Sequence, residues 1–197
     1  MNVLVACEFS GVVRRAFAAK GHYAWSCDLL PSLDESLFHF EEDVTTRILK
    51  YRWDLVIAFP PCTYLASSGI HWNKKKPERQ AQTEKAAEFF KMFTELDCKW
   101  AIENPVGVMS TLYRKPDQIV QPYEFGHNAS KRTCLWLNDL PKLEPTGYVE
   151  PRLVDGKPRW DNQLDSGQDR SPDSLGRAQR RSITYEGIAE AMAEQWG

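Results

Sequence analysis

Short apolar runs alternate with stretches of helical spacing along the first half of the chain, and this alternation limits the possible folds. The run "NVLVAC" at 2–7 predicts a strand that is buried on both faces, because it lacks polar alternation. Gly11 then interrupts the chain, and the apolar residues after it recur at helical spacing as far as Gly21. A second strand, "YAWSCD" at 23–28, ends in an acid. This succession predicts the start of a doubly wound nucleotide-binding sheet.

The rest of the chain continues the pattern. Further strands are predicted at 53–59, 99–104 and 132–138, and longer helices at 77–97 and 182–196. Short helices are predicted after Asp43 and within "GVMSTLY", whereas residues 29–42 and 63–76 are predicted to be loops. We therefore predict the α/β class, with a doubly wound, Rossmann-like sheet that carries helices on both faces.

The composition changes after residue 138. Residues 139–181 are rich in proline, glycine and charged residues and poor in apolar residues. They predict a small irregular insert rather than a second domain. The amphipathic spacing within 182–197 predicts a closing helix that packs back on the main domain, residues 1–138.

The net charge and the cysteine content limit the classes of protein to which this chain can belong. The net charge of −2 gives no global attraction to nucleic acid, so contact with a polyanion must come from local basic clusters. The five cysteines lie far apart, which argues against a zinc site or a disulfide framework and favours a reducing compartment. No stretch approaches the ~20 apolar residues of a membrane span, and the first apolar run is too short for a signal peptide. We expect a soluble cytoplasmic protein without a metal.

The chemistry is predicted to gather at the carboxyl ends of the strands, where ligands bind in open α/β sheets. The strand at 53–59 is followed by "PPC", which presents Cys62, and the strand at 99–104 ends in "ENP", which presents Glu103. A thiolate is a strong nucleophile, and a carboxyl group near it can protonate or hydrogen-bond a ring nitrogen. These residues also allow a second interpretation, a buried cysteine and an acid at a helix cap.

In chain order, "EFSGVVRRAF", "CD", "EDV", "FPPC" and "IENP" resemble the motifs of the cytosine-C5 DNA methyltransferases. That family has a Phe-x-Gly turn, acids that hold S-adenosylmethionine, a Pro-Cys nucleophile and a Glu-Asn-Pro motif, in the same order. The resemblance covers roughly residues 2–138 and the final helix. It implies a methyltransferase sheet, with residues 1–138 as the catalytic and cofactor-binding domain.

The resemblance implies S-adenosylmethionine as the cofactor. Phe9 would stack on its adenine, and backbone groups of Ser10 and Gly11 would lie near its methionine part. Asp28 would hold the ribose hydroxyls, and Asp43 would accept from the adenine amino group. The implied cofactor-binding residues are Phe9, Ser10, Gly11, Asp28, Asp43 and Pro60.

The resemblance also implies catalytic roles. Cys62 would attack C6 of a cytosine, and Glu103 would contact N3 and the exocyclic amine. The methyl group would then go to C5, and loss of the C5 proton would release the enzyme. Pro61 and Asn104 would shape the substrate site. Phe59 cannot accept a hydrogen bond from an amine, which argues against the amino-group methyltransferases that the same turn otherwise resembles.

A basic motif of the family, Gln-x-Arg-x-Arg, has a partial counterpart in "SKRTCLWL". Arg132 matches the first arginine by its position before a strand, which implies a catalytic role at the base or the intermediate. Ser130 stands where the family has glutamine, and Cys134 where it has the second arginine. The motif therefore departs from the family pattern at two of its three positions.

Most members of the family carry a large target-recognition domain between the late strand and the closing helix. Residues 139–181 leave only a reduced target-recognition region here. A target base must still be flipped from its stack, and phosphate contacts anchor the duplex. The side chains expected to bind phosphate are Lys74, Lys75 and Lys76, for which a solvated loop is the alternative.

Three functions are therefore weighed. The first is methylation of cytosine C5 in DNA, through a covalent bond between Cys62 and C6. The second is the same chemistry on single-stranded DNA, RNA or a free pyrimidine nucleotide, which a small recognition region would suit. The third is a catalytically degenerate relative that binds DNA or a protein. A compact enzyme of this kind would suit a phage.

Overall fold

A mixed sheet forms the centre of the protein, in a computed structural model that describes residues 1–170 and 182–197. Within these residues the sheet has seven strands, and β8 and β9 form a separate hairpin. Neighbouring strands from β3 to β5 run parallel, whereas β7 is antiparallel to both β5 and β6. In spatial order the strands are β3 (His39–Glu41), β2 (Tyr23–Asp28), β1 (Asn2–Ala6), β4 (Leu55–Ala58), β5 (Lys99–Pro105), β7 (Thr133–Asn138) and β6 (Gln118–Val120), with β8 (Arg152–Val154) and β9 (Lys157–Arg159) apart. The predicted α/β class is confirmed, and the sheet is compatible with a Rossmann-like fold.

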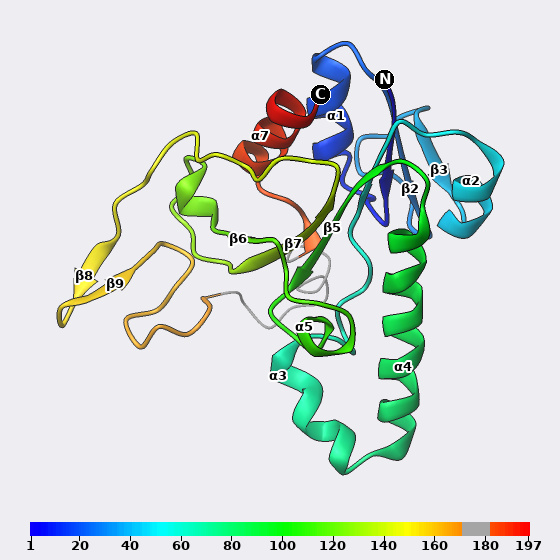
Figure 1. The fold of residues 1–197 in the computed structure, drawn as a ribbon. Helices are drawn as coiled ribbons and strands as arrows, with labels where there is room; N and C mark the ends of the chain where they lie inside the picture. Colours follow the sequence, from blue (N-terminus) through cyan, green and yellow to red (C-terminus); the bar gives the residue numbers. More distant parts are fainter. Residues whose placement is uncertain (171–181) are drawn as a thin grey trace.

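Helices cover both faces of this sheet (Figure 1). The first and last helices, α1 (Val12–Ala19) and α7 (Glu186–Trp196), share one face. The other face is covered by α2 (Val44–Lys50) and by the long helix α4 (Pro77–Met92). The shorter segments are α3 (Ser67–Ile70), α5 (Met109–Leu112), η1 (His71–Lys74), η2 (Phe93–Glu95) and η3 (Pro122–Glu124).

The central strands are buried on both faces. Val3 and Val5 of β1 belong to the core under α1 and α7, whereas Leu4 and Ala6 belong to the core under α2 and α4. All four are fully buried. Because alternate residues of a strand face opposite sides, burial of both sides removes the polar alternation and leaves the uninterrupted apolar run seen in the sequence.

Two segments that were predicted to be loops contain regular structure. Residues 29–42 include β3, which pairs with β2 at the edge of the sheet. Residues 63–76 include α3 and η1, and the side chains of α4 hold this segment in place. Arg79 Nη2 donates a 2.9 Å hydrogen bond to Thr63 O, and Asn73 Nδ2 donates one of 2.8 Å to Thr83 Oγ1. Neither segment has apolar periodicity, so the local sequence carried no sign of these elements.

The described part of the insert, residues 139–170, is anchored beside the start of β7. Trp160 stacks on Tyr123 of η3, with 4.3 Å between ring centroids. Asn162 exchanges two hydrogen bonds of 2.9 Å with the backbone of Ser130. These contacts pack the insert against the segment that leads into β7. The remainder of the predicted insert, with its arginine-rich end, lies outside the described residues.

Candidate functional site

Four parallel strands bring their carboxyl ends to one edge of the sheet, where the predicted site residues lie. Across the sheet these strands are β2, β1, β4 and β5. Asp28 is the last residue of β2, residues 7–11 follow β1, residues 59–62 follow β4, and Glu103 lies near the end of β5. Parallel pairing therefore gathers the predicted cofactor-binding and catalytic residues at one edge, although the sequence separates them widely.

The turn that carries Cys62 is tied to β5 by a side chain. Asn104 Nδ2 donates a 2.8 Å hydrogen bond to Pro60 O, and Asn104 is buried. Because proline has no backbone N–H, Pro60 and Pro61 cannot anchor this turn with donors of their own. The side chain of Asn104 therefore supplies a link between the two strand ends. Cys62 itself is exposed at the end of the turn.

A second link joins the segment after Cys62 to the segment after β5. Val108 N donates a 2.9 Å hydrogen bond to Leu65 O. A Cβ atom added at Gly107 would lie 2.0 Å from the same carbonyl oxygen, which is impossible without movement of the backbone. Leu65 is fully buried, so moving it away would open the core. Gly107 allows the close approach because it has no side chain.

Glu103 is a half-buried carboxyl group with a raised pKa. Burial raises the pKa, and the charge of Lys131 and a hydrogen bond with Thr133 only partly oppose this rise. Thr133 is held nearby because it pairs with Pro105 across β7 and β5. A carboxyl group in this state keeps its proton to a higher pH than an ordinary glutamate and can protonate a ring nitrogen.

Lys131, which the sequence analysis did not single out, is the cation that acts on Glu103. Arg132 is exposed, and its charge acts on the thiol of Cys134, where it partly opposes the rise in pKa caused by burial and by Glu103. Both cations precede β7 within the same basic motif, which was the available signal for Lys131. The catalytic role of Arg132 stays a prediction.

The turn after β1 holds a buried acid at the start of α1. Cys7 and Gly11 both have left-handed backbone conformations, with φ of 58° and 70°. Glu8 Oε1 accepts hydrogen bonds from Ser10 Oγ at 2.8 Å and from Val13 N at 3.0 Å. Glu8 Oε2 is buried and has no partner among the described residues. Burial raises the pKa of Glu8, and one oxygen of this carboxyl group is left without a hydrogen bond from the described part of the chain.

Phe9 and Asp28 lie at neighbouring strand ends. Phe9 is only 7% exposed, and its carbonyl accepts a 2.9 Å hydrogen bond from Leu33 N in the loop after β2. Asp28 is half-buried, and its Oδ1 accepts from Leu30 N at 2.9 Å. Burial raises the pKa of Asp28. The loop after β2 thus lies against the turn after β1, between the two predicted cofactor contacts.

Asp43 caps helix α2 and remains exposed. Its Oδ1 accepts hydrogen bonds from Thr45 Oγ1 at 2.7 Å and from Thr45 N at 2.9 Å. These bonds lower the pKa of Asp43, so the group is a carboxylate at neutral pH. The short helix predicted after Asp43 is confirmed. The carboxylate can accept from a ligand amine through its second oxygen.

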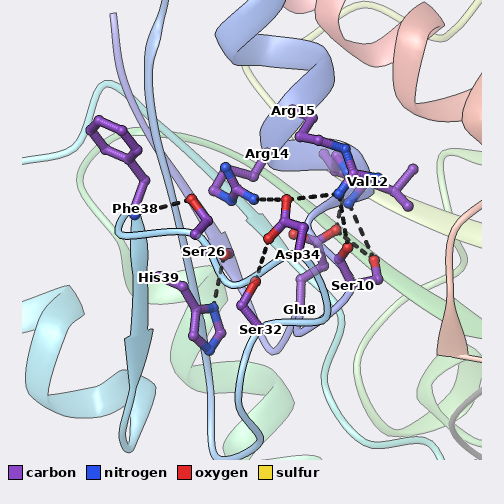
Figure 2. Close-up of polar contacts among 12 residues, drawn as sticks. Glu8, Ser10, Val12, Arg14, Arg15, Ser26, Ser32, Asp34, Phe38 and His39 are labelled. Carbon is purple, nitrogen blue, oxygen red and sulfur yellow. Dashed lines mark hydrogen bonds and ion pairs between the residues drawn. The ribbon is translucent and has the colours of Figure 1, made fainter.

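An ion-pair cluster that the sequence did not predict fastens the loop after β2 to α1 (Figure 2). Asp34 pairs with the buried Arg14 and, at 2.8 Å, with Arg15. It also accepts a 2.5 Å hydrogen bond from Ser32 Oγ, while Arg15 Nη1 donates to Ser10 O at 3.2 Å. Burial acts to raise the pKa of Asp34, but these hydrogen bonds and the charge of Arg14 outweigh it and hold the pKa well below its usual range.

Lys74, the first of the lysines predicted to bind phosphate, ends η1, and the other two lie between η1 and α4. Lys75 and Lys76 are exposed, and their ammonium groups lie 5.4 and 5.7 Å from the ring centroid of Trp72. The side chain of Lys74 lies outside the described part of the chain. Two cations and an exposed indole are thus presented shortly after the residue predicted to be the nucleophile.

Neither protein-family models nor curated proteins gave a match to this chain. Over residues 1–170 and 182–197, no helix has the length and apolar character that crossing a membrane requires. The same residues contain no group of three or more histidine, cysteine, aspartate or glutamate side chains that could hold a metal ion.

We expect Gly107→Ala to destabilise the protein, because the new Cβ atom would meet Leu65 O at 2.0 Å. Overpacking of this kind costs roughly 1–3 kcal/mol, or about 3–10 °C in Tm at this chain length. Gly147→Ala is the matched control, since its Cβ atom would meet nothing closer than 3.7 Å. Thermal unfolding of both variants measures the difference, and equal Tm values would refute the tight approach.

We expect Asp34→Asn to destabilise the protein by about 2 kcal/mol at pH 7. Breaking a fully buried ion pair costs ~3–5 kcal/mol. The cost is smaller here because the Asp34 side chain is 26% exposed. The folded-state pKa of Asp34 is lowered, so its contribution is present above the unfolded value and declines as the pH falls below about 4. Urea unfolding between pH 7 and pH 3 measures this. Asp165→Asn, in a far more exposed pair with Arg152, should cost under ~1 kcal/mol.

Proposed function

We propose that this protein is an S-adenosylmethionine-dependent methyltransferase that methylates C5 of cytosine in DNA through Cys62. The observation that carries the proposal is the link between two strand ends. The hydrogen bond from Asn104 to Pro60 ties the turn of the exposed Cys62 to the strand that carries Glu103. This link supports the proposal, because an exposed thiol that follows one strand and a carboxyl group with a raised pKa on the neighbouring strand are the groups that the reaction needs.

The residues at the strand ends fit the cofactor that the motifs imply. S-adenosylmethionine presents an ammonium group, ribose hydroxyls and an adenine amine, and this edge of the sheet offers acceptors for donors of that kind. Glu8 Oε2 is buried without a partner among the described residues, Asp28 is half-buried, and Asp43 is a charged, exposed carboxylate. When bound, the cofactor supplies the methyl group as an electrophile. Glu8, Asp28 and Asp43 would hold it, with the Phe9 ring beside its adenine.

The side chains of this chain account for the remaining steps. The thiolate of Cys62 adds to C6 of the cytosine while Glu103 gives its proton to N3, which makes C5 nucleophilic. After C5 has taken the methyl group, the C5 proton passes to a water molecule, its electron pair re-forms the ring double bond as the bond between Cys62 Sγ and C6 breaks, and Glu103 recovers its proton from N3. Lys131 stabilises the carboxylate form of Glu103 between these two steps, because its charge lowers the pKa of that group.

The alternatives differ in what carries the cytosine. The described part of the insert is small and is anchored at Ser130 and Tyr123. With so small an insert, the catalytic domain would make most of the contacts with the substrate. This favours single-stranded DNA, RNA or a nucleotide as the alternative substrate. A degenerate relative would bind DNA or a protein without turnover, and the altered motif around Arg132 is what favours it.

Transfer of a labelled methyl group tests the three functions together. The protein is incubated with methyl-labelled S-adenosylmethionine and duplex DNA, single-stranded DNA, RNA or a cytidine nucleotide. We expect label in duplex DNA, and none with Cys62→Ala, because no other group in the proposal can add to C6. Cys98→Ala, at a half-buried cysteine at the opposite edge of the sheet, is the matched control and should keep its activity.

The outcomes of this test separate the alternatives. Label only in single-stranded DNA, RNA or nucleotide keeps the chemistry and changes the substrate. Absence of transfer to every substrate would leave a binding protein. Transfer by Cys62→Ala would remove the covalent mechanism, whereas a stable adduct between Cys62 and 5-fluorocytosine DNA would support it, since fluorine at C5 cannot leave as a proton does.

Glu103→Gln should lose activity and gain stability. Without a transferable proton at N3 we expect methylation to fall by about 10²- to 10⁴-fold. The folded-state pKa of Glu103 is raised, so wild type loses stability relative to the glutamine variant as the pH rises above about 4.3, the ordinary glutamate value. Below that pH the two should be equally stable. Wild-type activity should also fall at high pH, as Glu103 loses its proton.

Glu88→Gln is the matched control for this experiment, because Glu88 is exposed on α4. It should leave both the methylation rate and the stability to urea at pH 7 unchanged. A Glu103→Gln variant that methylates at the wild-type rate, or that is less stable than wild type at pH 7, would contradict the role given to Glu103.

A further inference from the structure

An open pocket lies between the segment that follows Cys62 and the start of α4. Its volume is about 430 Å³, and it is lined by Tyr64, Trp72, Lys76, Glu78, Arg79 and Gln82. Figure 1 shows the surrounding elements, α3 and the amino-terminal end of α4, projecting away from the sheet. The motifs of the sequence assign nothing to this pocket, apart from a possible phosphate contact at Lys76.

The pocket combines an exposed aromatic surface with cations. Trp72 is 45% exposed, although indole is among the largest apolar groups that a fold can bury. The ammonium groups of Lys75 and Lys76 lie 5.4 and 5.7 Å from its ring centroid. Both lysines are exposed on flexible side chains, so they can leave the ring for a phosphate at little cost. Glu78 contributes one carboxylate to the lining.

Two of the lining residues, Tyr64 and Arg79, are held in place by contacts with the surrounding chain. The guanidinium of Arg79 lies 4.9 Å from the ring centroid of Tyr64 and donates to Thr63 O at 2.9 Å and Gly69 O at 3.2 Å. Tyr64 is also fixed through its carbonyl, which accepts a 3.0 Å hydrogen bond from Thr83 Oγ1. The pocket therefore combines side chains that are fixed in place with lysines on flexible side chains.

We propose that this pocket binds an unpaired nucleotide of the substrate strand, close to the target cytosine, with its base stacked on Trp72 and its phosphate on Lys75 and Lys76. Aromatic platforms with cations beside them are how proteins hold single-stranded nucleic acid, because every base has a face to stack and every nucleotide a phosphate. This inference rests on the proposed function for the identity of the target base.

The position of the pocket along the chain supports this occupant. Tyr64 lies two residues beyond Cys62, so the Cα atoms of the two are at most about 7 Å apart. One lining residue of the pocket therefore lies within reach of a nucleotide next to a cytosine at Cys62. A base can stack on Trp72 only when it is unpaired, so the pocket selects single-stranded or locally opened substrate.

Binding of a fluorescently labelled single-stranded oligonucleotide with one cytosine, measured by anisotropy at fixed salt, tests the proposal. We expect Trp72→Ala to weaken binding about tenfold or more, the usual effect of losing one stacked base, and Trp72→Phe to keep most of the affinity. Tyr51→Ala is the matched control, because Tyr51 is 46% exposed and has the Lys50 ammonium 5.9 Å from its ring centroid. It should bind as wild type does.

Two further measurements make the test specific. In the first, an abasic site is moved along the oligonucleotide. At one position near the cytosine, the abasic site should weaken binding to wild type as much as the Trp72→Ala substitution does. At that position it should not weaken binding to Trp72→Ala any further. Replacing Lys75 and Lys76 by glutamine should reduce the slope of log affinity against log salt by about 0.7, the value for one phosphate contact on a single strand. This second measurement does not depend on how well the tryptophan variants fold.

The results distinguish this inference from the proposed function. Unchanged affinity in Trp72→Ala, or an abasic effect that is the same in wild type and variant, would overturn the nucleotide pocket even if methyl transfer occurs. Binding that depends on Trp72 in a protein that transfers no label would overturn the methyltransferase and keep the pocket. Methyl transfer with a Trp72-dependent preference for unpaired substrate would support both.

Discussion

The hydrogen bond from Asn104 Nδ2 to Pro60 O is the contact on which the geometry of the site depends. Two consecutive prolines remove the backbone donors that would otherwise anchor the turn after β4, so the turn relies on a side chain from the next strand. Gly107 adds a second connection by letting Leu65 O approach its backbone. The position of Cys62 relative to Glu103 therefore follows from contacts between two loops as well as from the sheet.

The carboxyl groups around the site divide by the direction of their pKa shifts. Asp34 and Asp43 have lowered pKa values, because their oxygens accept hydrogen bonds or pair with arginine, and both fasten structural elements. Glu8, Asp28 and Glu103 have raised pKa values, because burial outweighs their partners. Raised values mark groups whose interactions are incomplete in the protein alone, and all three of these groups are assigned to ligands here. Asp43 is assigned to the cofactor as well, although hydrogen bonds lower its pKa.

Individual residues show which features of the fold and the site can be predicted from local sequence patterns. The strands β1 and β4 were predictable because burial on both faces leaves apolar runs, and Cys62 and Glu103 because they follow such runs directly. Lys131 was missed although it belongs to the same basic motif as Arg132, since the motif does not say which cation acts on Glu103. Asp34 was missed because its partners, on α1, come from another part of the chain.

The order of the longer elements, the α/β class and the residue types at the strand ends follow from the sequence alone, since they depend on hydrophobic periodicity and on short motifs. The three-dimensional fold adds everything that depends on distant contacts. It inserts β7 antiparallel between β5 and β6, gives structure to residues 63–76 through the side chains of α4, and exposes Trp72 beside a pocket. These features depend on contacts between segments far apart in the chain, and the hydrophobic periodicity within a segment does not predict such contacts.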